Sequence, residues 1–265
     1  MNYGLIGEHL GHSFSKIIHE MAIDHEYDIV EIAPEELDSF MKTADFKGIN
    51  VTIPYKQDVI PYLHEISDQA KKIGAVNTIV NKDGRLIGHN TDYAGMRDLF
   101  ALAGINPAGK KVLILGTGGT SKTAYAVTED LGAKEIYKVS RSGRDGAITY
   151  DEACTNHKDA DIIVNTTPSV MFPHVEGQPL SLDSFEKLSG LIDVIYNPLR
   201  TNLVLEAQKR GIPAMGGLYM LVSQAIYAEE LFCGLNHDKG LIDRIYHQLL
   251  LDSRNIVLSG MSMAG

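Results

Sequence analysis

The sequence predicts an α/β protein of two domains, in which the chain builds one domain, then a second, and finally returns to the first. Three observations predict this class. Apolar runs of strand length alternate with segments of helical periodicity along most of the chain. A glycine-rich turn of the strand–turn–helix type lies in mid-chain, at residues 116–119. The last two helical segments have no strand to accompany them.

The first domain is predicted to begin at residue 1 and to run to residue 91. Pro34 suits the first turn of a helix, and Pro54 ends the third strand. Lys82-Asp83-Gly84 lies between two short apolar runs and favours a hairpin turn. The predicted elements are, in order, strand 3–6, helix 12–25, strand 27–32, helix 34–43, strand 48–53 and hairpin strands 78–81 and 85–88.

The second domain is predicted over residues 92–216 as a parallel sheet covered by helices on both faces. Helix 93–103 follows Asp92 and leads into it, and Gly132 ends the helix after the glycine-rich turn. Four buried strands are expected, at 112–115, 136–139, 162–165 and 191–196.

The two terminal helices, 218–232 and 241–251, are expected to leave the second domain. Leu218, Leu221, Val222 and Ala225 share one face of the earlier helix. We expect both helices to pack on the first domain or across the cleft, so that the first domain comprises residues 1–91 and 217–265.

Composition excludes several classes of function. A net charge of −10 over 265 residues argues against general nucleic-acid binding. No apolar run approaches a membrane span, and the N-terminus lacks the pattern of a signal peptide, so a cytoplasmic location is expected. Cys154 and Cys233 form no CxxC pair, and the histidines show no HExxH spacing. We therefore predict no metal, and a monomer or homodimer that acts on a small molecule.

The glycine-rich turn predicts a site for the pyrophosphate of a dinucleotide. The apolar run 112–115 leads into Gly116-Thr117-Gly118-Gly119, and a helical pattern follows from Thr120. Ser121 replaces the third glycine of the usual fingerprint. The alternative is a strand–helix turn that needs glycine only for its backbone geometry.

The residues after the second strand of this domain predict which dinucleotide binds. An NAD site places an acidic side chain there, whereas an NADP site places arginine to pair with the 2′-phosphate. The segment is Ser140-Arg141-Ser142-Gly143-Arg144, which predicts NADP. The alternative is a solvated basic turn.

Polar side chains in the first domain suggest a site for a small polyhydroxylated acid. Ser13 and Ser15 precede a helix, where they would suit a carboxylate or act as a simple N-cap. Lys56 follows the strand that ends at Pro54, so it is either a site residue at the sheet edge or a surface lysine. Amides and hydroxyls also gather beside glycines in the segments 74–78 and 88–92.

Nine segments, in order along the chain, resemble those of the shikimate dehydrogenase family: GHSFS, KGINVTIPYK, GAVNT, GHNTDYAG, GTGGTS, SRSGR, NTTP, DVIYNP and GLYMLVSQA. The resemblance covers nearly the full length. It implies an α/β substrate domain, a Rossmann-like NADP domain, a deep cleft between them and C-terminal helices on the substrate domain. The implied activity is the reversible NADPH-dependent reduction of 3-dehydroshikimate to shikimate, in aromatic amino-acid biosynthesis.

The resemblance also implies roles for particular residues. Lys56 and Asp92 would form the catalytic pair. Ser13 and Ser15 would bind the substrate carboxylate, and Thr52, Asn77, Gln224 and Tyr196 would complete the substrate site, although a merely solvated Gln224 remains an alternative. The cofactor site would comprise Gly116, Thr117, Gly118, Gly119, Thr120, Ser121, Ser140, Arg141, Ser142, Arg144, Thr166 and Gly217.

The sequence departs from the family pattern at two places. Ser169-Val170 precedes Met171 where the family has a small residue and glycine, in a segment that the resemblance places beside the nicotinamide. Ser140-Arg141-Ser142 stands where Asn-Arg-Thr is common, and it keeps the arginine and a hydroxyl. Two alternative functions are a quinate/shikimate dehydrogenase of broader specificity and a non-catalytic regulatory module that binds the nucleotide.

Overall fold

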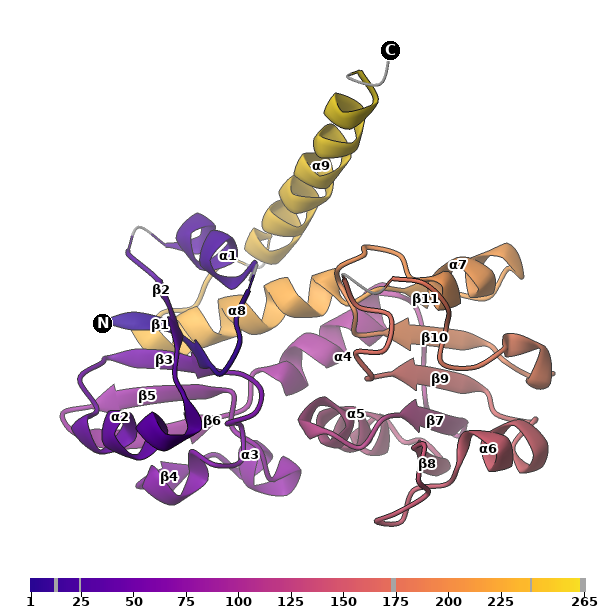
Figure 1. The fold of residues 1–265 in the computed structure, drawn as a ribbon, viewed down its shortest axis with the longest axis horizontal. Helices are drawn as coiled ribbons and strands as arrows, with labels where there is room; N and C mark the ends of the chain where they lie inside the picture. Colours follow the sequence, from indigo (N-terminus) through magenta and orange to yellow (C-terminus); the bar gives the residue numbers. More distant parts are fainter. Residues whose placement is uncertain (12–13, 24, 173–174, 239, 263–265) are drawn as a thin grey trace.

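The computed structural model describes residues 1–11, 14–23, 25–172, 175–238 and 240–262. These residues form two β-sheets, each with its own helices, which confirms the predicted two-domain α/β class (Figure 1). Helices α4 (Asp92–Leu102) and α8 (Leu218–Cys233) pack against each other between the sheets. They join the two halves of the molecule and fix how the sheet edges face one another.

The first sheet is mixed, with the strand order β2–β1–β3–β5–β6–β4. β1 pairs with β2 and β3 in parallel, while β5 runs antiparallel to β3 and β6. The predicted hairpin is confirmed, and Asp83 and Gly84 turn it with positive φ angles. The strands are β1 (Tyr3–Gly7), β2 (Asp28–Glu31), β3 (Gly48–Val51), β4 (Glu65–Ile66), β5 (Thr78–Lys82) and β6 (Arg85–His89).

Helices of the first sheet differ from the prediction mainly at their ends. The helix predicted at 12–25 is α1 (Ser15–Ala22), and residues 12, 13 and 24 lie outside the described part. The helix predicted at 34–43 splits into a 3-10 turn (Pro34–Glu36) and α2 (Leu37–Thr43). The sequence analysis missed α3 (Asp68–Ile73), the 3-10 turn Ile60–Tyr62 and β4, because segments this short show little periodicity.

The second sheet is entirely parallel, in the order β11–β10–β9–β7–β8. Its strands are β7 (Lys111–Leu115), β8 (Glu135–Val139), β9 (Ile162–Asn165), β10 (Gly190–Asp193) and β11 (Ala214–Met215). Its helices are α5 (Gly119–Asp130), α6 (Tyr150–Asn156), α7 (Asn202–Lys209) and the 3-10 helix Leu182–Ser184. Four elements of this sheet and its helices were not predicted from the sequence: α6, α7, β11 and the 3-10 helix.

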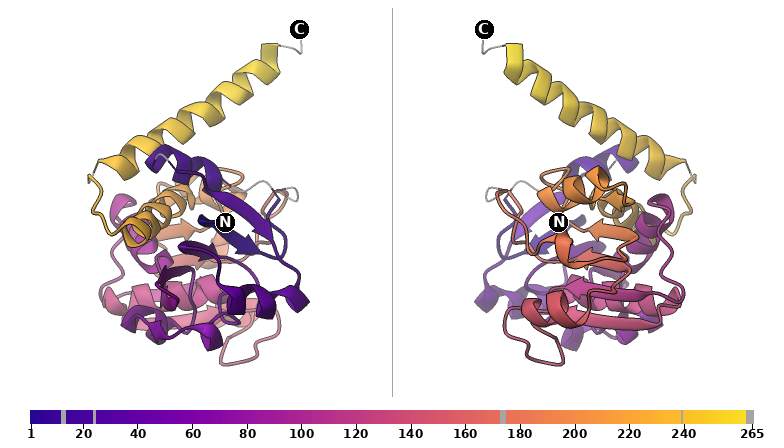
Figure 2. Two further views of the ribbon diagram at one scale, coloured as in Figure 1. Left: turned by 90° about the vertical axis from the view of Figure 1, so that its left-hand side faces the viewer. Right: turned by 90° about the vertical axis from the view of Figure 1, so that its right-hand side faces the viewer.

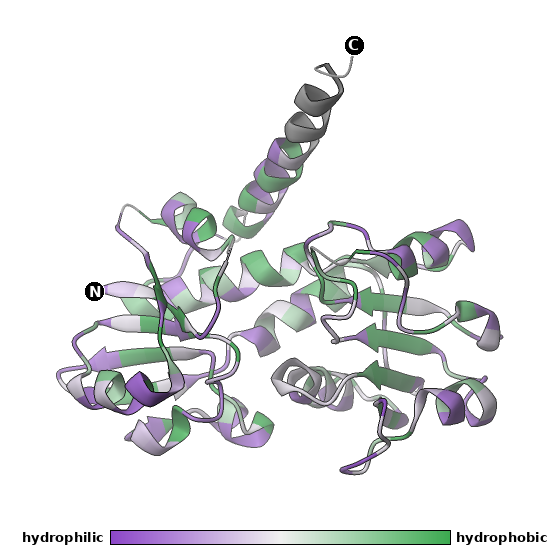
Figure 3. Cartoon of the chain, in the orientation of Figure 1, coloured by the Kyte–Doolittle hydropathy of each residue, from purple (hydrophilic) through white to green (hydrophobic). Residues whose placement is uncertain are grey.

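Alternate residues of β7 pack on opposite faces of this sheet. Val112 and Ile114 belong to a cluster with α4 and α5, whereas Leu113 and Leu115 belong to a cluster with α6 and α7. All four side chains are fully buried, and each such burial stabilises the fold by about 1.5–3 kcal/mol. Figure 3 shows β7, β9 and β10 as mostly hydrophobic strands, as a sheet covered on both faces requires.

The terminal helices return to the first sheet, as predicted. α8 packs on α1 and β5 as well as on α4, and α9 (Leu241–Ser262) packs on α1 and α8 through Ile245 and Leu249. α9 is longer than the predicted 241–251, and its far end leaves the body of the molecule (Figure 2). Within the described residues, no helix is long and apolar enough to cross a membrane.

Candidate active site

Lys56 and Asp92 meet in an ion pair between the two sheets. Lys56 follows β3, and Asp92 is the first residue of α4. The Nζ atom of Lys56 lies 2.6 Å from Oδ2 of Asp92, and their side chains are only 16% and 10% exposed. A largely buried pair of this kind holds an ammonium group in one place, with some access from solvent. The sequence alternative of a surface lysine is therefore wrong.

Asn77 connects this ion pair to its surroundings. Its Nδ2 atom donates to Oδ1 of Asp92 and to Oγ1 of Thr91, both at 3.0 Å, and lies 3.4 Å from Oε1 of Gln224. Its Oδ1 atom accepts from the amide of Thr91 at 2.7 Å. Four predicted site residues, Lys56, Asn77, Asp92 and Gln224, are thus brought together. Gln224 is buried, so it is not a merely solvated residue.

A further layer of buried polar residues supports Asn77 and was not singled out from sequence. Asn50 donates to the carbonyl of Asn77 at 3.3 Å and to Oγ1 of Thr78 at 3.1 Å. Thr78 in turn donates to Oδ1 of Asn77, and Tyr27 donates to Asn50. The sequence signal that could have identified them is their position in or beside short strands, close to the motifs that contain Asn77 and Asp92. The network holds the Asn77 amide at one orientation.

The glycine-rich turn lies where the strand order of the second sheet reverses, between β7 and β9. This point is the usual ligand crevice of a parallel α/β sheet. Gly116 has a φ of +112°, and a methyl group there would lie 2.7 Å from Oγ1 of Thr166, which follows β9. Gly116 is therefore required both for its backbone angle and for the close approach of Thr166.

The N-terminus of α5 has the features of an anion site. Its N-cap residue, Gly118, offers no side-chain cap, so the first-turn amides are free for a ligand. No described atom lies within 4 Å of where a Gly118 side chain would begin. Ser121 is buried in the same turn, and its hydroxyl has no hydrogen-bond partner among the described residues. These features fit the pyrophosphate of a dinucleotide.

The glycine-rich turn and the ion pair are neighbours, although they belong to different sheets. A methyl group on Gly119 would lie 3.8 Å from Cδ of Lys56. A dinucleotide that enters at the N-terminus of α5 would thus extend beside the Lys56 side chain.

The basic turn after β8 presents its two arginines to solvent. Arg141 and Arg144 are exposed, and neither makes an ion pair with the described residues. The turn is ordered by its own contacts, because Ser140 Oγ accepts from the Gly143 amide at 3.1 Å and Gly143 and Gly146 have positive φ angles. Two guanidinium groups without partners remain available for a phosphate.

Tyr196 and Gly217 both lie in close packing contacts, and that of Tyr196 is with the start of α1. The Tyr196 ring meets the Phe14 ring edge-on, with centroids 5.8 Å apart, which places it next to the start of α1. Burial raises the pKa of the Tyr196 hydroxyl, so it stays protonated and can donate. A methyl group on Gly217 would lie 2.0 Å from the carbonyl oxygen of Val194, so glycine is required for this close backbone packing.

Of the remaining predicted substrate residues, Ser15 and Thr52 lie within the described structure. Ser15 is the buried first residue of α1, and Thr52 is half-buried just after β3. Ser13 lies outside the described residues. In the unusual segment, Val170 is buried while Met171 and Phe172 are exposed, so the valine turns into the protein.

A parallel sheet with a glycine turn at its switch point lies beside a Lys–Asp pair that follows β3 of the mixed sheet and begins α4. This arrangement defines a dinucleotide-dependent dehydrogenase of two α/β domains. Residues 5–79 match the model of the shikimate dehydrogenase substrate binding domain. The NADP⁺ shikimate dehydrogenase of Clostridium beijerinckii is 39% identical over 92% of this chain and 96% of its own length. The chain belongs to the shikimate dehydrogenase family.

Solved structures agree with this family. Shikimate dehydrogenase 1 from Peptoclostridium difficile matches with a TM-score of 0.86 and 40% identity, over 95% of this chain and 99% of that one. The Thermus thermophilus shikimate 5-dehydrogenase in complex with NADP(H) and shikimate matches with a TM-score of 0.82 and 26% identity, over 94% and 99%.

Proposed function

We propose that this chain catalyses the reversible NADPH-dependent reduction of 3-dehydroshikimate to shikimate, a step in aromatic amino-acid biosynthesis. One observation carries the proposal: the Lys56–Asp92 pair, held by Asn77, lies beside the glycine turn of a nucleotide-binding sheet. The family of the chain supports the same conclusion. Cys154 and Cys233 are both free, which suits the reducing cytoplasm that we also propose as its location.

The proposal assigns the cofactor to residues 92–216 and the substrate to residues 1–91 and 217–265. The first-turn amides of α5 would hold the pyrophosphate, with Thr117, Thr120 and Ser121 beside it, and Arg141 and Arg144 would hold the 2′-phosphate, flanked by Ser140 and Ser142. Gly217 and Thr166 would line the nicotinamide end. When bound there, NADPH supplies the hydride that reduces the substrate carbonyl.

Lys56 is proposed as the group that stabilises and protonates the reacting oxygen. As the carbonyl carbon is reduced, its oxygen gains negative charge, and a fixed ammonium group lowers the energy of that state. Lys56 then gives a proton to the oxygen and regains one from solvent, to which its side chain keeps 16% exposure. Asp92 positions the ammonium group, and Asn77 orients Asp92 through the bond to its other oxygen.

The other substrate residues are proposed to bind rather than react. Ser13 and Ser15 would hold the carboxylate at the start of α1, and Tyr196 would donate its hydroxyl from the facing side. Thr52, Asn77 and Gln224 would hydrogen-bond the ring hydroxyls. Each neutral bond of this type contributes about 0.5–1.5 kcal/mol, so several are needed to fix the ring.

The direct test is an absorbance assay at the NADPH band with the purified chain. Shikimate and quinate are offered in turn, each with NADP⁺ and with NAD⁺. We expect shikimate with NADP⁺ to give the highest kcat/KM. Equal or faster oxidation of quinate would replace the proposal with a broader quinate/shikimate activity. No turnover with either acid, despite measurable NADP⁺ binding, would leave only a nucleotide-binding module.

A further inference from the structure

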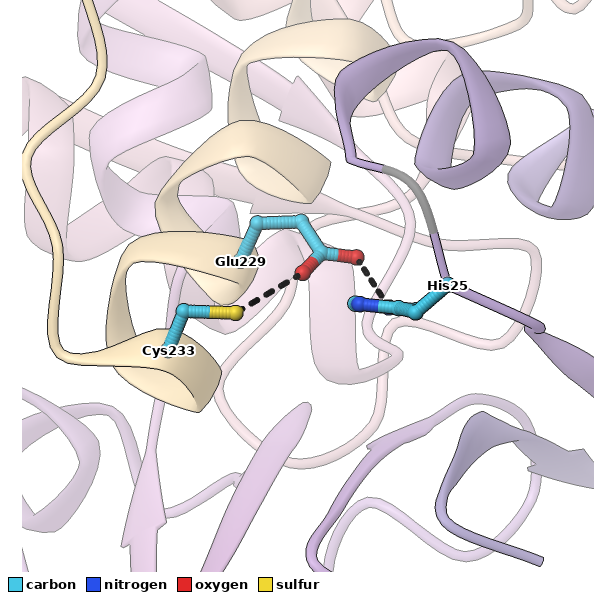
Figure 4. Close-up of side chains that lie close together, drawn as sticks. All are labelled: His25, Glu229 and Cys233. Carbon is cyan, nitrogen blue, oxygen red and sulfur yellow. Dashed lines mark hydrogen bonds and ion pairs between the residues drawn. The ribbon is translucent and has the colours of Figure 1, made fainter.

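Three potential metal ligands from distant parts of the chain meet between α8 and the segment that joins α1 to β2. They are His25, Glu229 and Cys233, and their ligand atoms all lie within 4.8 Å of one another (Figure 4). Glu229 and Cys233 are one turn apart on α8, so both project toward His25. The sequence predicted no metal because its histidines and cysteines show no short ligand spacing, and His25 is far along the chain from α8.

The separations suit a tetrahedral ion. Nε2 of His25 lies 3.3 Å from Oε1 of Glu229, and Sγ of Cys233 lies 3.9 Å from Oε2. Zinc bonds of about 2.0–2.3 Å would set neighbouring ligand atoms about 3.3–3.6 Å apart. Because the imidazole is close to Oε1 and the thiol to Oε2, both groups would move inward to share one ion with the carboxylate.

The cluster also holds a nitrogen whose hydrogen-bonding capacity is unused. Nε2 of His25 is buried and makes no hydrogen bond to the described residues. The His25 ring stacks on Tyr3 with centroids 4.4 Å apart, which fixes the direction of that nitrogen. Apart from its 3.3 Å contact with Oε1 of Glu229, this nitrogen makes no hydrogen bond to the described residues, and a metal ion would use its lone pair.

Glu229 has an outer partner of the type that metal-bound carboxylates have. It is fully buried, and Oε1 lies 2.5 Å from Nδ1 of His19. His19 is itself buried and stacks on Tyr27, with centroids 3.8 Å apart. This histidine holds the carboxylate at a fixed angle, as outer partners do in metal sites.

A surface pocket lies against one member of the cluster, His25. A cavity of about 400 Å³ is lined by Glu20, Ile23, His25 and Glu26. Its two carboxylates, those of Glu20 and Glu26, would attract a cation toward His25.

We propose that His25, Glu229 and Cys233 bind one divalent transition-metal ion of the zinc type, with water as the fourth ligand. Nitrogen, oxygen and sulfur donors together favour zinc over magnesium or calcium. The ion would fasten α8 to the segment before β2 and so stabilise the folded chain. This site is separate from Lys56 and Asp92, and it does not depend on the proposed reaction.

The test is a titration of chelator-treated, chelator-free protein with Co²⁺, followed by displacement with Zn²⁺. We expect one equivalent to bind and to give a near-ultraviolet thiolate-to-cobalt band. Cys233→Ala should abolish that band, and both Cys233→Ala and His25→Ala should weaken binding by more than the roughly 10–100-fold that loss of an outer partner costs. Cys154→Ala and His157→Ala are the matched controls and should bind like the unmodified chain.

Folding of the variants is checked by NADPH-dependent turnover, since neither His25 nor Cys233 belongs to the proposed active site. If Cys233→Ala is inactive, Cys233→Ser takes its place. Zn²⁺ should raise the thermal unfolding midpoint of the unmodified chain and leave that of the Cys233 variant unchanged. Absence of stoichiometric binding, binding without the thiolate band, or equal binding by an active Cys233 variant would each overturn the proposal.

Discussion

At the scale of single residues, Lys56 is the group that we propose to carry the chemistry. Its ammonium group is held by Asp92 at 2.6 Å, and Asp92 is held in turn by Asn77 at 3.0 Å. Lys56 and Asn77, at the two ends of this chain of contacts, are largely buried, so the lysine side chain is held against Asp92. A charge fixed in place before the reaction costs no reorganisation when the oxygen becomes negative.

Lys56→Ala is therefore expected to lower kcat for shikimate oxidation by about 100-fold or more, the usual scale for loss of acid–base or electrostatic help. Binding of shikimate should persist, because the binding groups remain. Steady-state kinetics and equilibrium titration measure the two effects. Lys71→Ala, at a lysine whose side chain is 63% exposed, is the control. Near-normal turnover in Lys56→Ala would remove this residue from the mechanism.

Ser13 and Ser15 are expected to act in binding, because the carboxylate they would hold is remote from the reacting carbon. Replacing both with alanine should raise KM for shikimate more than it lowers kcat, since uniform binding is lost. The experiment is a full kcat and KM determination for the double variant, with Ser39→Ala as a surface control. A large fall in kcat at unchanged KM would contradict the binding role.

At the scale of elements, two glycines serve different purposes. Gly217 lies against the backbone of Val194, where an added methyl group would come within 2.0 Å of a carbonyl oxygen. Gly118 is the N-cap of α5, has an ordinary φ of −74°, and faces open space. One glycine is needed for packing, and the other leaves room for a ligand.

This difference predicts opposite outcomes for the same substitution. Gly217→Ala should lower the free energy of unfolding by about 1–3 kcal/mol, the usual cost of overpacking. Gly118→Ala should lower it by less than about 1 kcal/mol, yet raise KM for NADPH, because the methyl group occupies the expected pyrophosphate space. Denaturant unfolding and cofactor kinetics on both variants test this. Destabilisation by Gly118→Ala with an unchanged KM would contradict the assignment.

Elements that are long, or that end in a glycine-rich turn, could be predicted from the sequence, whereas short elements could not. The strand–turn–helix of β7 and α5 is signalled by four consecutive apolar residues and Gly116-Thr117-Gly118-Gly119. β4 and β11 span two residues each, too few for any periodicity to register. Helix ends were misplaced because caps and 3-10 turns, such as Pro34–Glu36, depend on tertiary contacts.

At the scale of the whole molecule, function depends on contacts between segments far apart in sequence. The sequence indicated Lys56 and Asp92, but only folding reveals that Asn77 joins Asp92 to Gln224, or that Gly119 lies beside Lys56. The contact between His25 and Glu229 could not be predicted either, because these residues are also far apart in sequence. α4 and α8 create these contacts, because they cross between the sheets and set the two sheet edges face to face (Figure 1).

In the proposed function, one molecule unites an NADP site on the second sheet with a shikimate site on the first. Cofactor preference during shikimate oxidation tests it most directly, through kcat/KM for NADP⁺ and NAD⁺. Charge-assisted bonds to the 2′-phosphate contribute about 1.5–3 kcal/mol each, or about 10- to 100-fold in preference. Arg141 should supply such bonds only to NADP⁺.

We predict that the unmodified chain prefers NADP⁺, and that Arg141→Ala reduces the preference about 10- to 100-fold, chiefly through KM for NADP⁺. Activity with NAD⁺ should change little. The control is Arg85→Ala, at an exposed arginine beside β4, which should change neither the cofactor preference nor the activity with NAD⁺. Preference for NAD⁺ in the unmodified chain, or equal weakening of both cofactors by Arg141→Ala, would contradict the account.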